Sequence, residues 1–100
     1  MVETKDHADA LCVHAGQHLC ALPIRSVIET MRPLPVETLA SAPSFVRGAA
    51  IVRGVPTAVV DLLALIDGVE SERFGRFVTI RVERHTVALG VDAVVGLCSL

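Results

Sequence analysis

Short blocks of aliphatic and β-branched residues, separated by glycine and proline, run along most of the chain. They cover residues 11–15, 18–22, 48–52, 56–61, 76–82 and 86–91, and residues 92–97 extend the last of them. This spacing is typical of short strands joined by tight turns. Sustained helical periodicity is absent, so the pattern predicts an all-β domain.

The first two blocks predict a β-hairpin. Gly16 begins a two-residue loop at the position where a type II′ turn needs a positive φ. In that register Val13 faces Cys20, and both side chains lie on the inner face of the strand pair. We therefore expect Gly16 to have a structural role.

A second register would change the chemistry of this hairpin. With a three-residue loop over residues 15–17, four metal-binding side chains would share one face: Cys12, His14, His18 and Cys20. Two thiolates and two imidazoles form a tetrahedral zinc set. Because a slip of one residue turns the faces of a strand over, the pattern alone leaves a zinc-binding hairpin open as an alternative.

The remaining blocks predict a second group of strands with one short helix. Asp61 stands where it can cap a helix over residues 62–66, which Gly68 would end. The apolar loop over residues 34–46 is expected to lie across the barrel, with one helical turn after Pro43. Alternation over residues 76–82 predicts a strand with two distinct faces.

Composition narrows the classes of function. The 100 residues suffice for one domain, with a polar tail over residues 1–10 and the domain over residues 11–100. With 9 Lys and Arg against 11 Asp and Glu, there is no basic excess to bind nucleic acid. Hydrophobic residues make up 52% before the 7 Gly are counted, against about 45–50% with glycine in an ordinary domain. That excess indicates a protein partner.

The sequence also predicts the chemistry that this protein lacks. The serines have no paired histidine and acid at a recognisable spacing, and no glycine-rich phosphate loop is present. We expect no enzyme and no cofactor. Three cysteines argue against a disulfide scaffold, and Cys20 and Cys98 are expected to be inert buried thiols. Without a signal peptide or a membrane-inserting segment, the expected location is the cytoplasm.

Four stretches, in this order, resemble the CheW-like chemotaxis coupling domain. They are ALPIRSVIE at residues 21–29, PSFVRG at 43–48, VRGVPTAVVDL at 52–62 and GVDAVVGL at 90–97. The third is the most specific, and together they extend the resemblance over about residues 11–100.

The resemblance implies small, SH3-like β-barrel subdomains and a scaffold without a cofactor. Members of that family link methyl-accepting chemoreceptor tips to a CheA-type histidine kinase in membrane-associated arrays. The resemblance also favours the two-residue hairpin loop. An alternative function is a regulatory domain of a larger signalling kinase, because similar domains occur at the end of CheA and at the start of CheV-type adaptors.

The local patterns and the resemblance together assign residues to two roles. The expected partner-binding residues are Val27, Glu29, Val52, Arg53, Gly54 and Val60. The expected structural residues are Gly16, Pro56, Asp61, Gly90 and Asp92. Apolar strand faces over residues 52–60 and 78–82 are expected to bury against partners, while Glu29 and Arg53 orient them.

Two departures from the family pattern matter. Ile51-Val52 replaces the usual Asn-Leu before Arg53, which removes an amide beside the arginine. Family members also continue beyond the position of Leu100, so an incomplete barrel is expected here. Unpaired strand edges then predict self-association, with barrels completed by strand exchange between copies.

Overall fold

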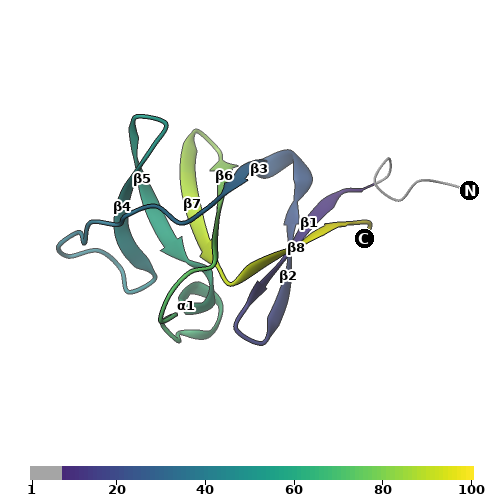
Figure 1. Cartoon of the computed structure of the whole chain (residues 1–100), viewed down its shortest axis with the longest axis horizontal. Helices are drawn as coiled ribbons and strands as arrows, with labels where there is room; N and C mark the ends of the chain where they lie inside the picture. Colours follow the sequence, from purple (N-terminus) through teal and green to yellow (C-terminus); the bar gives the residue numbers. More distant parts are fainter. Residues whose placement is uncertain (1–7) are drawn as a thin grey trace, which may run out of the picture.

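The computed structural model describes residues 8–100, and these residues form two β-sheets with one short helix (Figure 1). The strands are β1 (Ala10–Ala15), β2 (His18–Pro23), β3 (Val27–Met31), β4 (Val46–Val52), β5 (Val55–Asp61), β6 (Arg76–Val82), β7 (His85–Val91) and β8 (Ala93–Cys98). A 3-10 turn, η2 (Ile24–Ser26), precedes β3, and the helix α1 (Leu62–Asp67) follows β5. The predicted all-β class is confirmed.

The two sheets divide the chain unevenly. The smaller sheet has the order β2-β1-β8 and lies beside the C-terminus (Figure 1). The larger sheet has the order β3-β6-β7-β5-β4. Its β5–β7 pair is parallel, and all the other strand pairs are antiparallel. The middle strands of the larger sheet therefore need cover on both faces.

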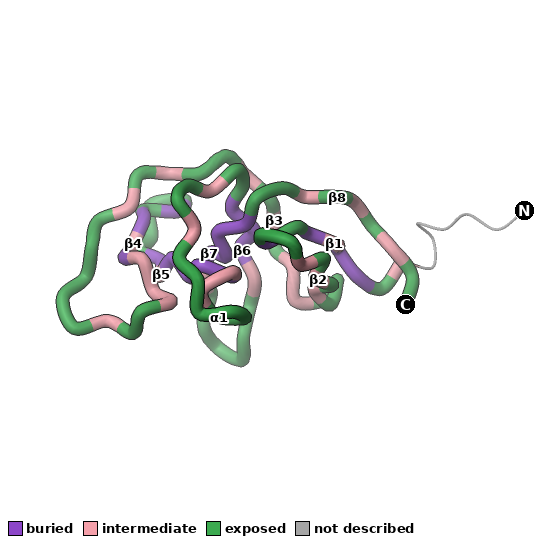
Figure 2. The backbone as a smooth tube through the Cα atoms, turned by 90° about the horizontal axis from the view of Figure 1, so that it is seen from below, coloured by how far each residue is buried: buried purple, intermediate pink, exposed green. Residues whose placement is uncertain are grey.

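Two apolar clusters provide that cover, and the buried stretches of backbone lie in the middle of the molecule (Figure 2). Val78 faces a cluster that includes Leu11 and Val13 of the smaller sheet. Phe77, its neighbour in β6, faces the other cluster, against which Leu34 and Val36 of the long loop pack. The loop thus crosses the sheet as predicted, although Pro43 opens a single hydrogen-bonded turn and no helical turn.

Residues 76–82 form the predicted strand with two distinct faces, and in its middle both faces are buried. Phe77, Val78 and Thr79 are all buried, because β6 is an inner strand with both faces covered. Residues at the two ends of the strand, such as Arg76 and Val82, reach solvent.

The hairpin adopts the two-residue register. Val13 pairs with Cys20, Ala15 pairs with His18, and Gly16 has a φ of 61°. Cys12 and His14 therefore lie on the opposite face of the hairpin from His18 and Cys20. The zinc-binding alternative is overturned by this register, and the described residues hold no group of three or more side chains suited to a metal ion.

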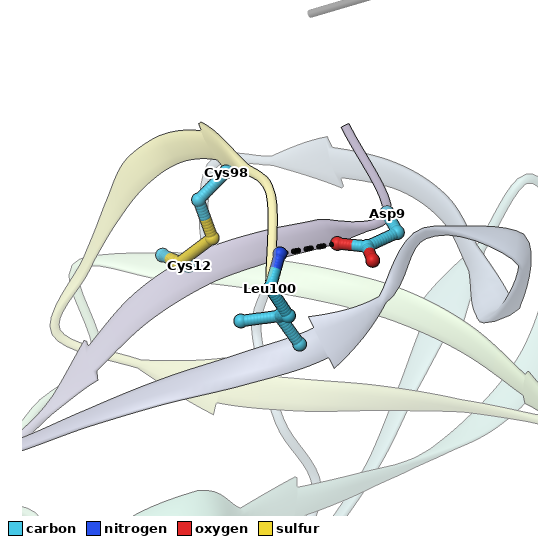
Figure 3. The surroundings of a disulfide bond; sticks show 4 residues. All are labelled: Asp9, Cys12, Cys98 and Leu100. Carbon is cyan, nitrogen blue, oxygen red and sulfur yellow. Dashed lines mark hydrogen bonds between the residues drawn. A yellow bond between two sulfur atoms is a disulfide. The ribbon is translucent and has the colours of Figure 1, made fainter. Parts of the chain in front are cut away.

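A disulfide corrects the expectation that Cys98 is an inert buried thiol. Cys12 of β1 is bonded to Cys98 of β8, and only Cys20 is free among the three (Figure 3). The two bonded residues are 86 positions apart, so sequence spacing carried no sign of the pairing. Because Ala10 pairs with Cys98 and Cys12 with Gly96, the two cysteines are diagonal neighbours on one face of the sheet.

The start of the domain also differs from the prediction. Asp9 and Ala10, assigned to a polar tail, belong to the folded sheet: the Asp9 N–H donates to the carbonyl of Cys98, and Ala10 opens β1. Asp9 Oδ1 also accepts from the Leu100 N–H at 2.9 Å (Figure 3). The rest of the predicted tail, residues 1–7, lies outside the described residues.

Candidate functional site

Arg53 and Glu29, two predicted partner-binding residues, bind each other. Arg53 Nε donates to Glu29 Oε2 at 2.8 Å, and Arg53 Nη2 donates to Glu29 Oε1 at 2.7 Å. This two-pronged geometry matches the planar guanidinium to the carboxylate and fixes the direction of both groups. The Arg53 side chain is 78% exposed and that of Glu29 is 26% exposed, so the pair presents mainly its arginine to solvent.

The local turn explains how Arg53 reaches this position. Arg53 and Gly54 form the two-residue loop between β4 and β5, with φ values of 50° and 81°. Two consecutive positive φ values are the mark of a type I′ turn, whose twist suits a hairpin. Glycine takes this conformation without strain, whereas an arginine there is uncommon. Such a residue is often held in place for function.

An apolar hollow of about 230 Å³ adjoins the ion pair. Its lining comes from five strands and one turn: Ile28, Glu29, Val52, Arg53, Val55, Thr57, Thr79 and Thr86. Two of its hydroxyls are satisfied internally, since Thr57 donates to the Val55 carbonyl and Thr79 to the Glu29 carbonyl. The hollow is therefore an apolar depression with a charged pair in its wall.

The rim of this hollow carries exposed apolar side chains. Ile28 is 51% exposed and Val55 is 59% exposed. Adjacent apolar side chains of this kind, next to fixed charges, are typical of a protein-binding surface. We call Ile28, Glu29, Arg53 and Val55 the rim residues. Sequence reasoning missed Ile28 and Val55, although both lie within stretches that carry the resemblance.

Electrostatics inside the pair favour the charged forms. The hydrogen bond from Arg53 is the main reason that the pKa of Glu29 lies below its ordinary value of 4.5. The charge of Arg53 acts in the same direction, while loss of solvent around the carboxyl opposes both. In return, the bond to Glu29 raises the pKa of Arg53. The pair is therefore ionised at neutral pH.

Three of the predicted partner-binding side chains are largely covered by the chain itself. Val52 and Val60 are only 8% and 9% exposed, and Val27 packs against the first apolar cluster. The expectation that the strand faces over residues 52–60 and 78–82 are available to a partner is corrected for the buried residues, such as Val60 and Val78, which pack in the core, whereas Val55 and Val82 are exposed. Val52 still contributes to the wall of the hollow.

Asp61 is fully buried and holds four groups together. It caps α1 by accepting from the Ala64 N–H at 3.3 Å, which confirms the predicted cap. It also accepts from Arg47 Nη1 at 2.7 Å and from both the N–H and the hydroxyl of Ser71. Arg47 further donates to the Ser71 carbonyl and lies over the Phe74 ring. Sequence reasoning missed this network, whose members come from three segments.

The other predicted structural residues lie at contacts of the backbone. Asp92 Oδ2 accepts from the Gly16 N–H at 2.7 Å, which joins the hairpin turn to the start of β8. Gly90 packs against the ring of Phe74, where a Cβ would collide with the ring. Pro56 is the second residue of β5, opposite Ile51.

Cys20, the free thiol, is partly buried on the inner face of the hairpin. Burial raises the pKa of this thiol above its ordinary value of 9.0. A nucleophilic cysteine needs the opposite shift, so Cys20 has no activated character.

Comparisons with known proteins agree on one family. The sequence model described as the CheW-like domain matches residues 9–100. Among solved structures, the crystal structure of scaffolding protein TtCheW from Thermoanaerobacter tengcongensis is similar, with a TM-score of 0.81, 21% identity and 93% of this chain covered. This chain spans 65% of that protein's length, which is less than two thirds. The comparison with curated proteins finds no match. Within residues 8–100, no helix has both the length and the apolar character needed to cross a membrane.

Proposed function

Because this chain belongs to the CheW-like domain family, we propose that it is a non-enzymatic adaptor that couples chemoreceptor tips to a CheA-type histidine kinase. The observation that carries the proposal is the Arg53–Glu29 pair at the edge of the apolar hollow. Such an adaptor acts through binding geometry and requires no cofactor. Its place would be the cytoplasm, beside membrane receptor arrays.

The rim residues contribute to binding in different ways. Apolar atoms of Ile28 and Val55 lose contact with water when a partner covers them, which supplies most of the favourable free energy. The exposed guanidinium of Arg53 orients the partner and steers its approach more than it tightens the complex. Glu29 holds that guanidinium in one direction, so less side-chain freedom is lost on binding.

The direct test measures binding of the purified chain to a receptor tip and to a kinase regulatory domain. Arg53→Ala and Val55→Ala should each weaken at least one of these interactions. Arg76→Ala is the matched control for charge, because Arg76 is also exposed and begins β6, at the far end of the sheet from the β4–β5 turn. Equal loss of binding in the control, or no loss in either rim variant, would contradict the proposed surface.

A further inference from the structure

The disulfide of the smaller sheet lies on the face turned away from the core (Figure 3). Cys12 and Cys98 are both half-buried, and neither belongs to the two apolar clusters, whereas Val13 beside Cys12 packs in the first of them. Exchange begins when an attacking thiolate reaches one of the two bonded sulfurs, so its rate depends on access to them. A bond in this position can be opened and closed while the chain is folded.

The backbone holds the two cysteines together without the bond. Ala10 pairs with Cys98 and Cys12 with Gly96, and the Cα atoms of the two cysteines are 6.6 Å apart. This separation lies within the range of about 4.4–6.8 Å that a disulfide spans. β1 is also paired with β2 along its whole length, which fixes its position in the sheet. Reduction therefore leaves both thiols side by side.

Backbone hydrogen bonds on either side of the cysteines support the same arrangement. The Asp9 N–H donates to the carbonyl of Cys98 at 3.1 Å. The Asp92 N–H, just before β8, donates to the carbonyl of His14 at 2.8 Å. Two thiols held next to each other in this way react with each other at a high effective concentration. Closure of the bond is thus favoured over reaction with other protein thiols.

The third thiol stands outside this pair. Cys20 lies on the other face of the hairpin, where it packs against the first apolar cluster. Burial raises the pKa of Cys20, so little of it is present as the attacking thiolate. Cys12 and Cys98 therefore have two states, bonded and reduced, without rearrangement to another pairing.

The compartment decides what such a bond does. In the cytoplasm, glutathione and thioredoxin keep thiols reduced, and the disulfides that form there are usually transient or redox-sensing. In an oxidising compartment the same bond would be a permanent cross-link. The redox-sensing role rests on the proposed function, which places the chain in the cytoplasm.

We infer that Cys12 and Cys98 form a reversible thiol–disulfide switch whose reaction partner is a small thiol of the glutathione class. One small thiolate attacks a sulfur of the bond, forms a mixed disulfide with that cysteine and releases the other cysteine as a thiolate. A second small thiolate then attacks the mixed disulfide at the sulfur of the small thiol. Overall, the bond between two cysteines is exchanged for a bond between two small thiols, whose two protons pass to Cys12 and Cys98.

The switch acts on the stability of the folded chain. In the oxidised state, a covalent loop spanning 86 positions restricts the unfolded chain, so the folded chain is favoured. In the reduced state, the same native pairing remains without that restriction. The redox state of the surrounding small thiols thereby sets how readily the chain unfolds.

The test equilibrates the unmodified chain at several ratios of reduced to oxidised glutathione, starting once from the oxidised and once from the reduced chain. Free thiols are then alkylated and counted by mass spectrometry. The controlling quantity is the concentration of oxidised glutathione divided by the square of that of the reduced form. A hundredfold change in this quantity should change the ratio of oxidised to reduced chain a hundredfold, because one disulfide is exchanged for another. Both starting points should converge, and Cys20→Ser, the matched control, should follow the same curve.

A bond that stays closed in excess reduced glutathione would overturn the inference, because it would be a permanent cross-link. A pair that stays open in excess oxidised glutathione, starting points that do not converge, or a shifted curve for Cys20→Ser would do the same. Amide hydrogen exchange gives a separate readout. The amides of β1 should stay protected in the reduced chain, and loss of their protection would show that the backbone does not hold the thiols in place.

Partner binding and the redox reaction can be tested separately. The rim residues belong to the larger sheet and its β4–β5 turn, whereas both cysteines belong to the smaller sheet. Arg53→Ala should therefore weaken partner binding without moving the glutathione curve. Cys12→Ser should abolish the curve without abolishing partner binding.

Discussion

Arg53 and Glu29 come from opposite sides of the larger sheet, yet their side chains form a two-pronged ion pair at 2.7 and 2.8 Å. β3 and β4 are the two edge strands of this sheet, with three strands between them. The sheet must therefore curl until the β4–β5 turn approaches β3, as the predicted barrel requires. Among the described residues, side chains bridge the opening, and no strand pairing closes it.

The positive φ of Arg53 predicts an unusual change in melting temperature when this residue is replaced by glycine. Arg53→Gly removes the cost of a side chain at a positive φ, so its melting temperature should equal or exceed that of the unmodified chain. Arg53→Ala keeps that strain and loses the ion pair, so it should melt at the same temperature or slightly below. Calorimetry measures the melting temperatures of both variants and of the unmodified chain. A large drop in both variants would show that Arg53 supports the fold rather than a partner.

The pKa of Glu29 provides a test of the ion pair in solution. A carboxyl whose folded pKa is lowered contributes stability above its unfolded pKa, near 4.5, and loses it as the pH falls through the folded pKa. NMR titration should therefore place the Glu29 pKa below 4.5. In Arg53→Ala only the loss of solvent remains, so the value should rise to 4.5 or above. An unchanged value would mean that the pair does not form.

Asp61 should be the most sensitive polar position in the chain. Asp61→Ala removes the helix cap and leaves the Arg47 guanidinium, 27% exposed, without its carboxylate. We expect a loss of about 4 kcal/mol in the free energy of unfolding, measured with urea. Asp61→Asn retains an oxygen for the cap and should lose about 1 kcal/mol less. If both variants unfold like the original chain, the network does not stabilise the fold.

The disulfide predicts a redox dependence of stability. Cys12→Ser opens a covalent loop of 86 residues, which corresponds to about 4.6 kcal/mol in the chain-entropy model. The unmodified chain in a dithiol reductant should match this variant in its urea midpoint. Cys20→Ser should keep the response to the reductant, since Cys20 is not bonded. A midpoint that the reductant does not move would count against the bond.

Local sequence signals proved sufficient wherever the deciding contact lies nearby in the chain. The hairpin around Gly16 and the cap at Asp61 were both predicted, because each depends on backbone geometry within a few residues. The family was recognisable for a related reason, as four short stretches kept their order. The zinc alternative arose where local pattern left two registers open.

The sequence by itself determined the all-β class, most strand positions and the residues Arg53 and Glu29 as candidates. Only the tertiary structure decided that these two residues bind each other, that Val52 and Val60 are buried, and that Cys12 meets Cys98. The physical reason is that strand order and sheet curvature place distant segments side by side. Strand order and sheet curvature depend on which faces the whole chain can bury together. A short stretch of neighbouring residues does not contain that information.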